Sequence, residues 1–172
     1  MQPNTQFIDK LKQIHTQALA QTDTETAAAL RQSELCGKFR EHYSSLASRL
    51  NREIVMPTLI QFAGAIPNVS GPREANEKWD EDFETYDAVC EIAPVTVPEP
   101  PVKLRLRIRA DADHAGLTIE CEITSKEAEL FHDATDLAVE GIERDKLQNW
   151  IEDAVSDAYR RFCELNYAPT SR

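Results

Sequence analysis

The chain has 172 residues, of which 30 are Asp or Glu and 19 are Lys or Arg, so its formal net charge is −11. This length suits one domain, or one domain with a helical appendage, and it allows an ordinary hydrophobic core. The acidic balance argues against nucleic acid and against an anionic membrane surface as partners, since both require a basic surface on the protein.

The cysteines and the apolar segments bear on the cellular compartment of the protein. Four cysteines lie far apart in the sequence, and none belongs to a C-x-x-C pair, which predicts reduced structural thiols. The sequence shows no leader of charged, apolar and small residues, and no apolar run of about 18 residues. We therefore expect a cytoplasmic protein with no membrane partner.

Residues 1–62 are expected to form a helical hairpin. Residues 4–56 contain almost no Gly, no Pro and many Gln, Ala, Leu, Arg and Glu, which favours helix. Two apolar stripes recur at a spacing of three or four residues. The first is Phe7, Leu11, Ile14 and Ala18, and the second is Ala28, Leu35, Phe39, Tyr43, Leu46, Leu50 and Ile54. Residues 22–26 are good caps and predict a boundary between two helices, with a single long helix as the alternative.

The second helix of this hairpin would be the longer one. At 1.5 Å per residue it would extend about 45 Å, whereas the first would extend about 25 Å. The part of the second helix that extends beyond the first must pack against another apolar surface. The sequence therefore predicts a homodimer that forms through residues 28–62.

Pro57 is expected to end or kink the second helix. The segment 58–66 that follows is apolar almost all round, which predicts burial under a sheet or, alternatively, a patch that faces a partner. Residues 63–84 are expected to form an acidic loop, in which Trp79 and Phe83 stand among carboxylates. Such a run is typical of a solvated loop, and it is also found in segments that dock on a basic partner.

Four later segments carry strand patterns. The clearest is a run that alternates apolar and basic residues without a break, so that one face of the strand is apolar and the other cationic. The expected strands cover residues 85–93, 102–110, 117–124 and, for a shorter fourth strand, 127–132. Together they predict a three- or four-stranded antiparallel meander whose apolar face must be covered.

The basic row of the second of these strands has two interpretations. Antiparallel pairing with the next strand would place Arg107 opposite Glu120 and Arg105 opposite Glu122, which predicts cross-strand charge pairs that fix the register. The alternative is docking against an acidic partner, including the chain's own segment 74–91.

The last helix is expected to start near Asp145, where Asp145 and Gln148 form a D-x-x-Q capping arrangement. Its apolar residues recur at helical spacing over five turns. They are Leu147, Trp150, Ile151, Ala154, Val155, Ala158, Phe162 and Leu165. We expect this stripe, with Trp150 in the core, to cover the sheet. The predicted fold class is therefore α+β: an N-terminal helical hairpin, an antiparallel meander and a C-terminal amphipathic helix, with residues 85–172 forming one structural unit with the hairpin.

One group of residues is a candidate for chemistry. The chain contains no phosphate-binding glycine motif, nucleophile elbow or H-E-x-x-H motif, and we predict no catalytic residue and no cofactor. If residues 127–132 return antiparallel, then His114, His132 and Asp133 reach the same end of the hairpin and could ligate a divalent metal. Polar residues are also what turns normally contain, and we expect no metal there.

These observations predict a non-catalytic protein–protein interaction or assembly module, with a protein partner or a second copy of itself. The order of helices, meander and helix in an acidic chain of this size loosely resembles the secretion chaperones that bind unfolded effectors. That resemblance implies the alternative of a chaperone-like protein for a client chain, and a small metal-dependent enzyme is the second alternative. The expected partner-binding residues are Tyr43, Leu46, Leu50, Leu59, Ile60, Phe62 and Trp79.

Overall fold

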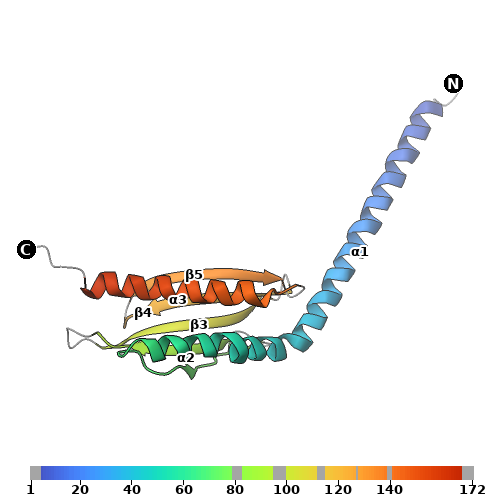
Figure 1. The fold of residues 1–172 in the computed structure, drawn as a ribbon. Coiled ribbons are helices and arrows are strands. Elements are labelled where there is room, and N and C mark those ends of the chain that lie inside the picture. The colour runs from blue at the N-terminus through green and yellow to red at the C-terminus, as the bar shows by residue number, and fades with distance from the viewer. Residues whose placement is uncertain are drawn as a thin grey trace, which may run out of the picture. The chain divides into compact units, whose positions relative to one another are not determined.

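The protein divides into two compact units, Met1–Lys38 and Phe39–Arg172. A computed structural model describes residues 5–78, 83–94, 100–111, 115–126, 128–138 and 141–167. The first unit is helical, and the second contains a five-stranded antiparallel sheet with helices packed on it (Figure 1). The predicted α+β class is therefore confirmed.

The first helix, α1 (Thr5–Leu50), is continuous, so the predicted hairpin is wrong and the alternative of one long helix is correct. The expected boundary fails because its threonines bond within the helix. Thr22, Thr24 and Thr26 donate their hydroxyls to the carbonyls four residues earlier, at 2.9, 2.8 and 2.8 Å. A threonine that bonds back in this way satisfies its hydroxyl without starting a new helix.

The helix does not end at Pro57 either. α1 passes through a turn of π-helix, η1 (Asn51–Val55), into α2 (Met56–Ala65). The N–H of Met56 donates to the carbonyl of Asn51, five residues back, and proline has no N–H with which to reach Glu53. Arg144, at the start of the last helix, donates to the Glu53 carbonyl at 3.4 Å and pairs with the Glu53 carboxylate at 3.0 Å. The wider turn and this outside donor let the chain stay helical across the proline.

The sheet is a meander of five strands, where three or four were predicted. The strands are β1 (Arg73–Glu74), β2 (Tyr86–Ile92), β3 (Val102–Asp111), β4 (Gly116–Thr124) and β5 (Glu129–Ala138), and they pair in that order. β1 is too short to have a period of its own, and it lies inside the predicted acidic loop. β5 is longer than the strand predicted at 127–132. It is an edge strand, and its half-exposed positions do not alternate clearly in hydrophobicity, so its length could not be predicted from the sequence.

The predicted register of the central hairpin is confirmed. Arg105 lies opposite Glu122, and Arg107 lies opposite Glu120. The aliphatic residues between these cations therefore all lie on the other face of the sheet. Those of β3 and β4 that are fully or almost fully buried are Leu104, Leu106, Ile108, Leu117, Ile119 and Ile123.

Helices cover this apolar face from one side (Figure 1). η1 and α2 pack on β2, and α3 (Arg144–Tyr167) packs on β4 and β5. The stripe predicted for α3 is largely confirmed, since Leu147, Ile151, Ala154, Val155, Ala158 and Phe162 are buried. Its remaining two members differ from the prediction: Trp150 is only half-buried, beside the edge strand β5, and Leu165 is exposed.

From Phe39 onward, the second apolar stripe predicted from the sequence packs inside the second unit, whereas its first two members, Ala28 and Leu35, are exposed. Phe39, Tyr43 and Leu50 are buried, and the Tyr43 hydroxyl donates to the carbonyl of Glu84 at 2.7 Å. Phe83, which was expected in a solvated loop, is buried against Tyr43 with 5.1 Å between the ring centroids. The part of α1 after residue 38 therefore finds its apolar surface within its own chain.

The buried stripe of α3 gives a direct test of the core. Phe162 is fully buried, whereas Leu165 on the same helix is 48% exposed. Replacing Phe162 by Ala should lower the free energy of unfolding by about 3–5 kcal/mol, because a large cavity remains. The control, Leu165→Ala, should change it by no more than about 0.5 kcal/mol, as is usual at the surface. Urea unfolding of both variants makes the comparison, and similar losses would contradict this packing.

Candidate functional site

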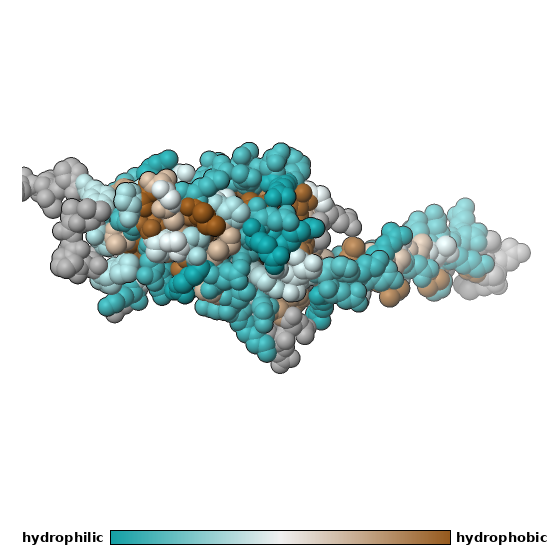
Figure 2. All heavy atoms as spheres, turned by 60° about the horizontal axis from the view of Figure 1, so that its bottom comes forward, coloured by the Kyte–Doolittle hydropathy of each residue, from teal (hydrophilic) through white to brown (hydrophobic). Residues whose placement is uncertain are grey.

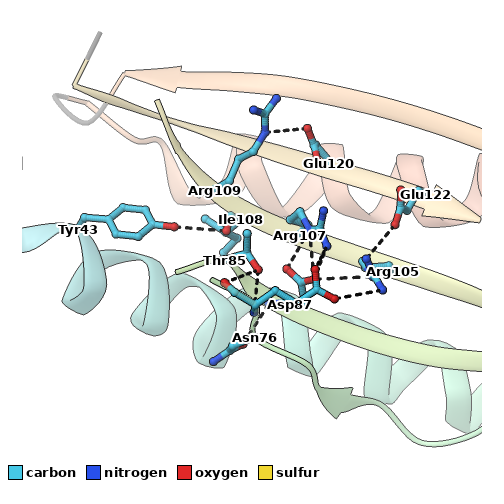
Figure 3. Close-up of polar contacts among 11 residues, drawn as sticks. Tyr43, Asn76, Thr85, Asp87, Arg105, Arg107, Ile108, Arg109, Glu120 and Glu122 are labelled. Carbon is cyan, nitrogen blue, oxygen red and sulfur yellow. Dashed lines mark hydrogen bonds and ion pairs between the residues drawn. The ribbon is translucent and has the colours of Figure 1, made fainter. Parts of the chain in front are cut away.

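The most concentrated polar cluster lies on the face of the sheet opposite the core. We call it the charged ladder, and it consists of Asp87, Arg105, Arg107, Arg109, Glu120 and Glu122 (Figure 3). The period of two along β2, β3 and β4 brings these side chains to one face. They come from three neighbouring strands, so Arg105 and Arg107, on the middle strand, have carboxylates on both sides.

Asp87 is the centre of the ladder and is fully buried. Arg107 donates to it through Nε, at 3.2 and 3.1 Å from the two carboxylate oxygens, and through NH2 at 2.9 Å. Burial by itself lowers the pKa of Arg107, but the hydrogen bond and the charge of Asp87, together with Glu77 and Glu122, outweigh this and raise it. The guanidinium therefore stays charged, which satisfies the buried carboxylate.

Hydrogen bonds join the segment that follows β1, at Asn76 and Glu77, to the charged ladder and its neighbour Thr85. Glu77 accepts a hydrogen bond from Arg107 at 3.0 Å, and its backbone N–H donates to the Thr85 hydroxyl at 3.1 Å. The backbone N–H of Asp87 donates to the side-chain oxygen of Asn76 at 3.1 Å. Acidic residues of the predicted loop thus serve as partners for the chain's own arginines.

The other two arginines pair with β4. Arg105 NH1 lies 3.4 Å from Glu122, and Arg109 donates to Glu120 at 2.8 Å. The residue opposite Arg107 in register is therefore not its ion partner, because Arg107 turns toward Asp87 and Glu120 is taken by Arg109. Both sequence interpretations of the basic row are thus observed: one set of arginine contacts crosses to β4, and the other goes to segment 74–91.

The arrangement of the ladder determines what it can do. Each of its three arginines has a carboxylate within 3.4 Å, so their charge is balanced within the sheet. One polar atom is left over: Arg105 Nε is buried without a hydrogen-bond partner, 3.7 Å from Asp87. Opposite charges held in this way fix strand order and register, and they give an outside anion little unbalanced charge to bind.

The ladder predicts a large effect of removing its central charge. Asp87→Asn should lower the free energy of unfolding by about 2–4 kcal/mol, because it leaves a half-buried arginine pair without its anion. The control, Glu53→Gln, removes an exposed partner of Arg144 and should cost less than about 1 kcal/mol. Urea unfolding at neutral pH measures both. Equal, small losses would show that Asp87 does not hold the sheet together.

The two described residues of the candidate metal site, His132 and Asp133, point away from each other. His132 lies opposite Glu122, and Asp133 lies opposite Cys121, so their side chains leave β5 on opposite faces. The end of β5 that returns beside Gly116 is Ala138, which is about 20 Å further along the strand than His132. His114 lies outside the described residues. Within the described part of the chain, no three His, Cys, Asp or Glu residues form a group that could hold a metal ion.

The expected partner-binding residues have different environments. Tyr43, Leu50 and Leu59 are buried in the core, where a partner cannot reach them, because each packs against the chain's own sheet or helices. Leu46 and Phe62 are half-buried, and Ile60 is 56% exposed. Trp79 lies outside the described residues. Of the described members of this set, only the α2 residues Ile60 and Phe62 and the α1 residue Leu46 present surface.

The first unit carries large apolar residues that its own chain leaves exposed. Six large aliphatic side chains in residues 5–38 are 39–62% exposed, and Figure 2 shows hydrophobic side chains, in brown, spaced along this helix. They are Ile8, Leu11, Ile14, Leu19, Leu30 and Leu35. The 3–4 spacing of the first stripe was the available signal, but a hairpin partner had been expected to cover it.

The thiols differ in their availability for chemistry. Burial raises the pKa of Cys90 to about 11 and that of Cys121, which also feels Asp133 and Glu122, to about 12. Cys36 and Cys163 are half-exposed, and none of the four cysteines forms a disulfide. Because the thiolate is the reactive form, Cys90 and Cys121 are protected in two ways: reagents cannot reach them, and their thiols stay protonated.

This difference predicts a labelling pattern. Iodoacetamide at pH 8 should modify Cys36 and Cys163 in the folded protein and spare Cys90 and Cys121, and peptide mass spectrometry can read all four sites. In urea all four should react at similar rates, which serves as the control. Rapid modification of Cys121 in the folded protein would show that the sheet opens there.

Among the described residues, no helix combines the length and the hydrophobicity needed to cross a lipid bilayer. Comparison with family models, with curated proteins and with solved structures finds no match to this chain. Its function must therefore be inferred from its own residues and contacts.

Proposed function

We propose that the protein is a non-catalytic assembly module that binds further copies of itself through residues 5–38. One observation carries the proposal. Apart from Cys36, every residue of this segment whose exposure is described is exposed, and six of these are large aliphatic residues. In the rest of the described chain, only Ile60, Leu165 and Tyr167 are large, apolar and exposed.

Helix energetics support a partner for this segment. A lone helix is marginally stable in water, and most helical stability in proteins comes from packing an apolar face. The threonines at 22, 24 and 26 lower the helix propensity further. Burying one Leu or Ile side chain contributes about 1.5–3 kcal/mol, so a partner that covers several of them would stabilise the helix substantially.

Charge supports a second copy as that partner. Residues 5–38 contain four Lys or Arg and four Asp or Glu, so this segment is neutral, although the whole chain carries −11. Copies of the segment can therefore approach one another without the net repulsion that the rest of the acidic chain would impose. Four cysteines without a disulfide agree with a cytoplasmic setting, where thiols stay reduced.

The proposal predicts the mass of the protein in solution. Light scattering at micromolar concentration should give a multiple of the chain mass of 19.4 kDa. A variant in which Leu11, Ile14, Leu19 and Leu30 are all replaced by Gln should give 19.4 kDa, because the apolar surface is lost while helix propensity is retained.

The matched control changes exposed residues on the charged side of the same helix. Ala20→Gln combined with Ala27→Gln should leave unchanged both the mass of the assembly and its helix content, which circular dichroism measures. A wild-type mass of 19.4 kDa at micromolar concentration would overturn the proposal. The exposed residues would then point to the alternative of a client chain.

A further inference from the structure

Five of the six exposed aliphatic residues of the first unit lie in two separate rows, and the sixth, Leu35, belongs to neither. A helix advances by about 100° per residue, which gives each side chain a direction around its axis. Leu11 and Ile14, with Ala18 between them, fall within an arc of about 60°. Ile8, Leu19 and Leu30 fall within an arc of about 40°, and they recur every 11 residues, or about three turns. We call these row A and row B.

The two rows face different directions. Their centres are about 110° apart around the helix. Six of the eight charged residues between 5 and 38 lie on the remaining part of the circumference. They are Asp9, Lys10, Asp23, Arg31, Glu34 and Lys38. Of the two exceptions, Lys12 lies at the edge of the arc of row B, and Glu25 lies within the arc of row A, farther along the helix.

A two-helix pair cannot cover both rows. Pairing along row A encloses Leu11 and Ile14 and then meets Gln21 and Glu25, leaving row B in water. Pairing along row B leaves row A in water. A strict two-stranded seam uses a narrow apolar stripe, whereas a helix with a wider apolar arc packs in a bundle against two neighbours.

We infer that each N-terminal helix packs between two others, so that four chains assemble through residues 5–38. In a four-helix bundle the two neighbours of a helix lie at roughly a right angle around it, which matches the separation of rows A and B. The occupants of both rows are further copies of this segment, whose neutral charge permits the association. This inference rests on the proposed self-association and adds to it the number of chains and the use of row B.

Light scattering separates the rows. The wild-type protein should have a mass of about 78 kDa, four times the chain mass of 19.4 kDa. The row A variant, Leu11→Gln with Ile14→Gln, and the row B variant, Leu19→Gln with Leu30→Gln, should each give about 39 kDa, because one of the two contacts survives in each. Ala20→Gln with Ala27→Gln is the control and should remain at the wild-type mass.

Each outcome decides one point. A wild-type mass of about 39 kDa that the row B variant leaves unchanged would overturn the four-chain inference and leave the proposed self-association intact. A wild-type mass of 19.4 kDa would overturn both. Circular dichroism of each variant at the same concentration shows whether a lost contact also unwinds the helix, as expected for a segment stabilised by its neighbours.

Discussion

The alternation of strand β3 is the constraint on which the second unit depends. Its backbone separates two environments: Leu104, Leu106 and Ile108 must leave water, and the arginines between them must keep their charge satisfied. The apolar side requires a cover, which α2 and α3 provide. The cationic side requires anions, which come from both neighbouring strands and from the segment beside β1. A buried carboxylate such as Asp87 is tolerable only where a cation already faces it.

Sequence patterns correctly predicted those helices and strands that have one side in the apolar core and the other side in a polar environment. β3, β4 and α3 each divide sharply into an apolar and a polar side, so their period, and even the Arg105–Glu122 register, could be predicted. Asp87 was missed, although a carboxylate near the start of a largely apolar strand was a visible signal. Its partner Arg107 had been paired with Glu120 on register alone, and register does not say to which side a long side chain bends.

The edges and the long helix could not be predicted, for different physical reasons. β1 has two residues, too few for a period, and β5 has water near both faces, which weakens its alternation. Threonine is common at helix starts and is also stable inside a helix when it bonds back, so residues 22–26 fitted either structure. An apolar stripe shows that a helix has a partner, but its spacing is the same whether that partner is the same chain, as for Tyr43, or another one.

The outer edge of β5 limits how copies of this protein can meet. No described strand pairs with that edge, and an open edge ten residues long normally invites a strand from a neighbouring molecule. Asp133, however, is exposed and lies on the same face of the sheet as buried Cys121. A strand added beside it would remove water from that carboxylate, which costs free energy. Asp133 thus disfavours edge-to-edge pairing of this sheet with a strand of another molecule.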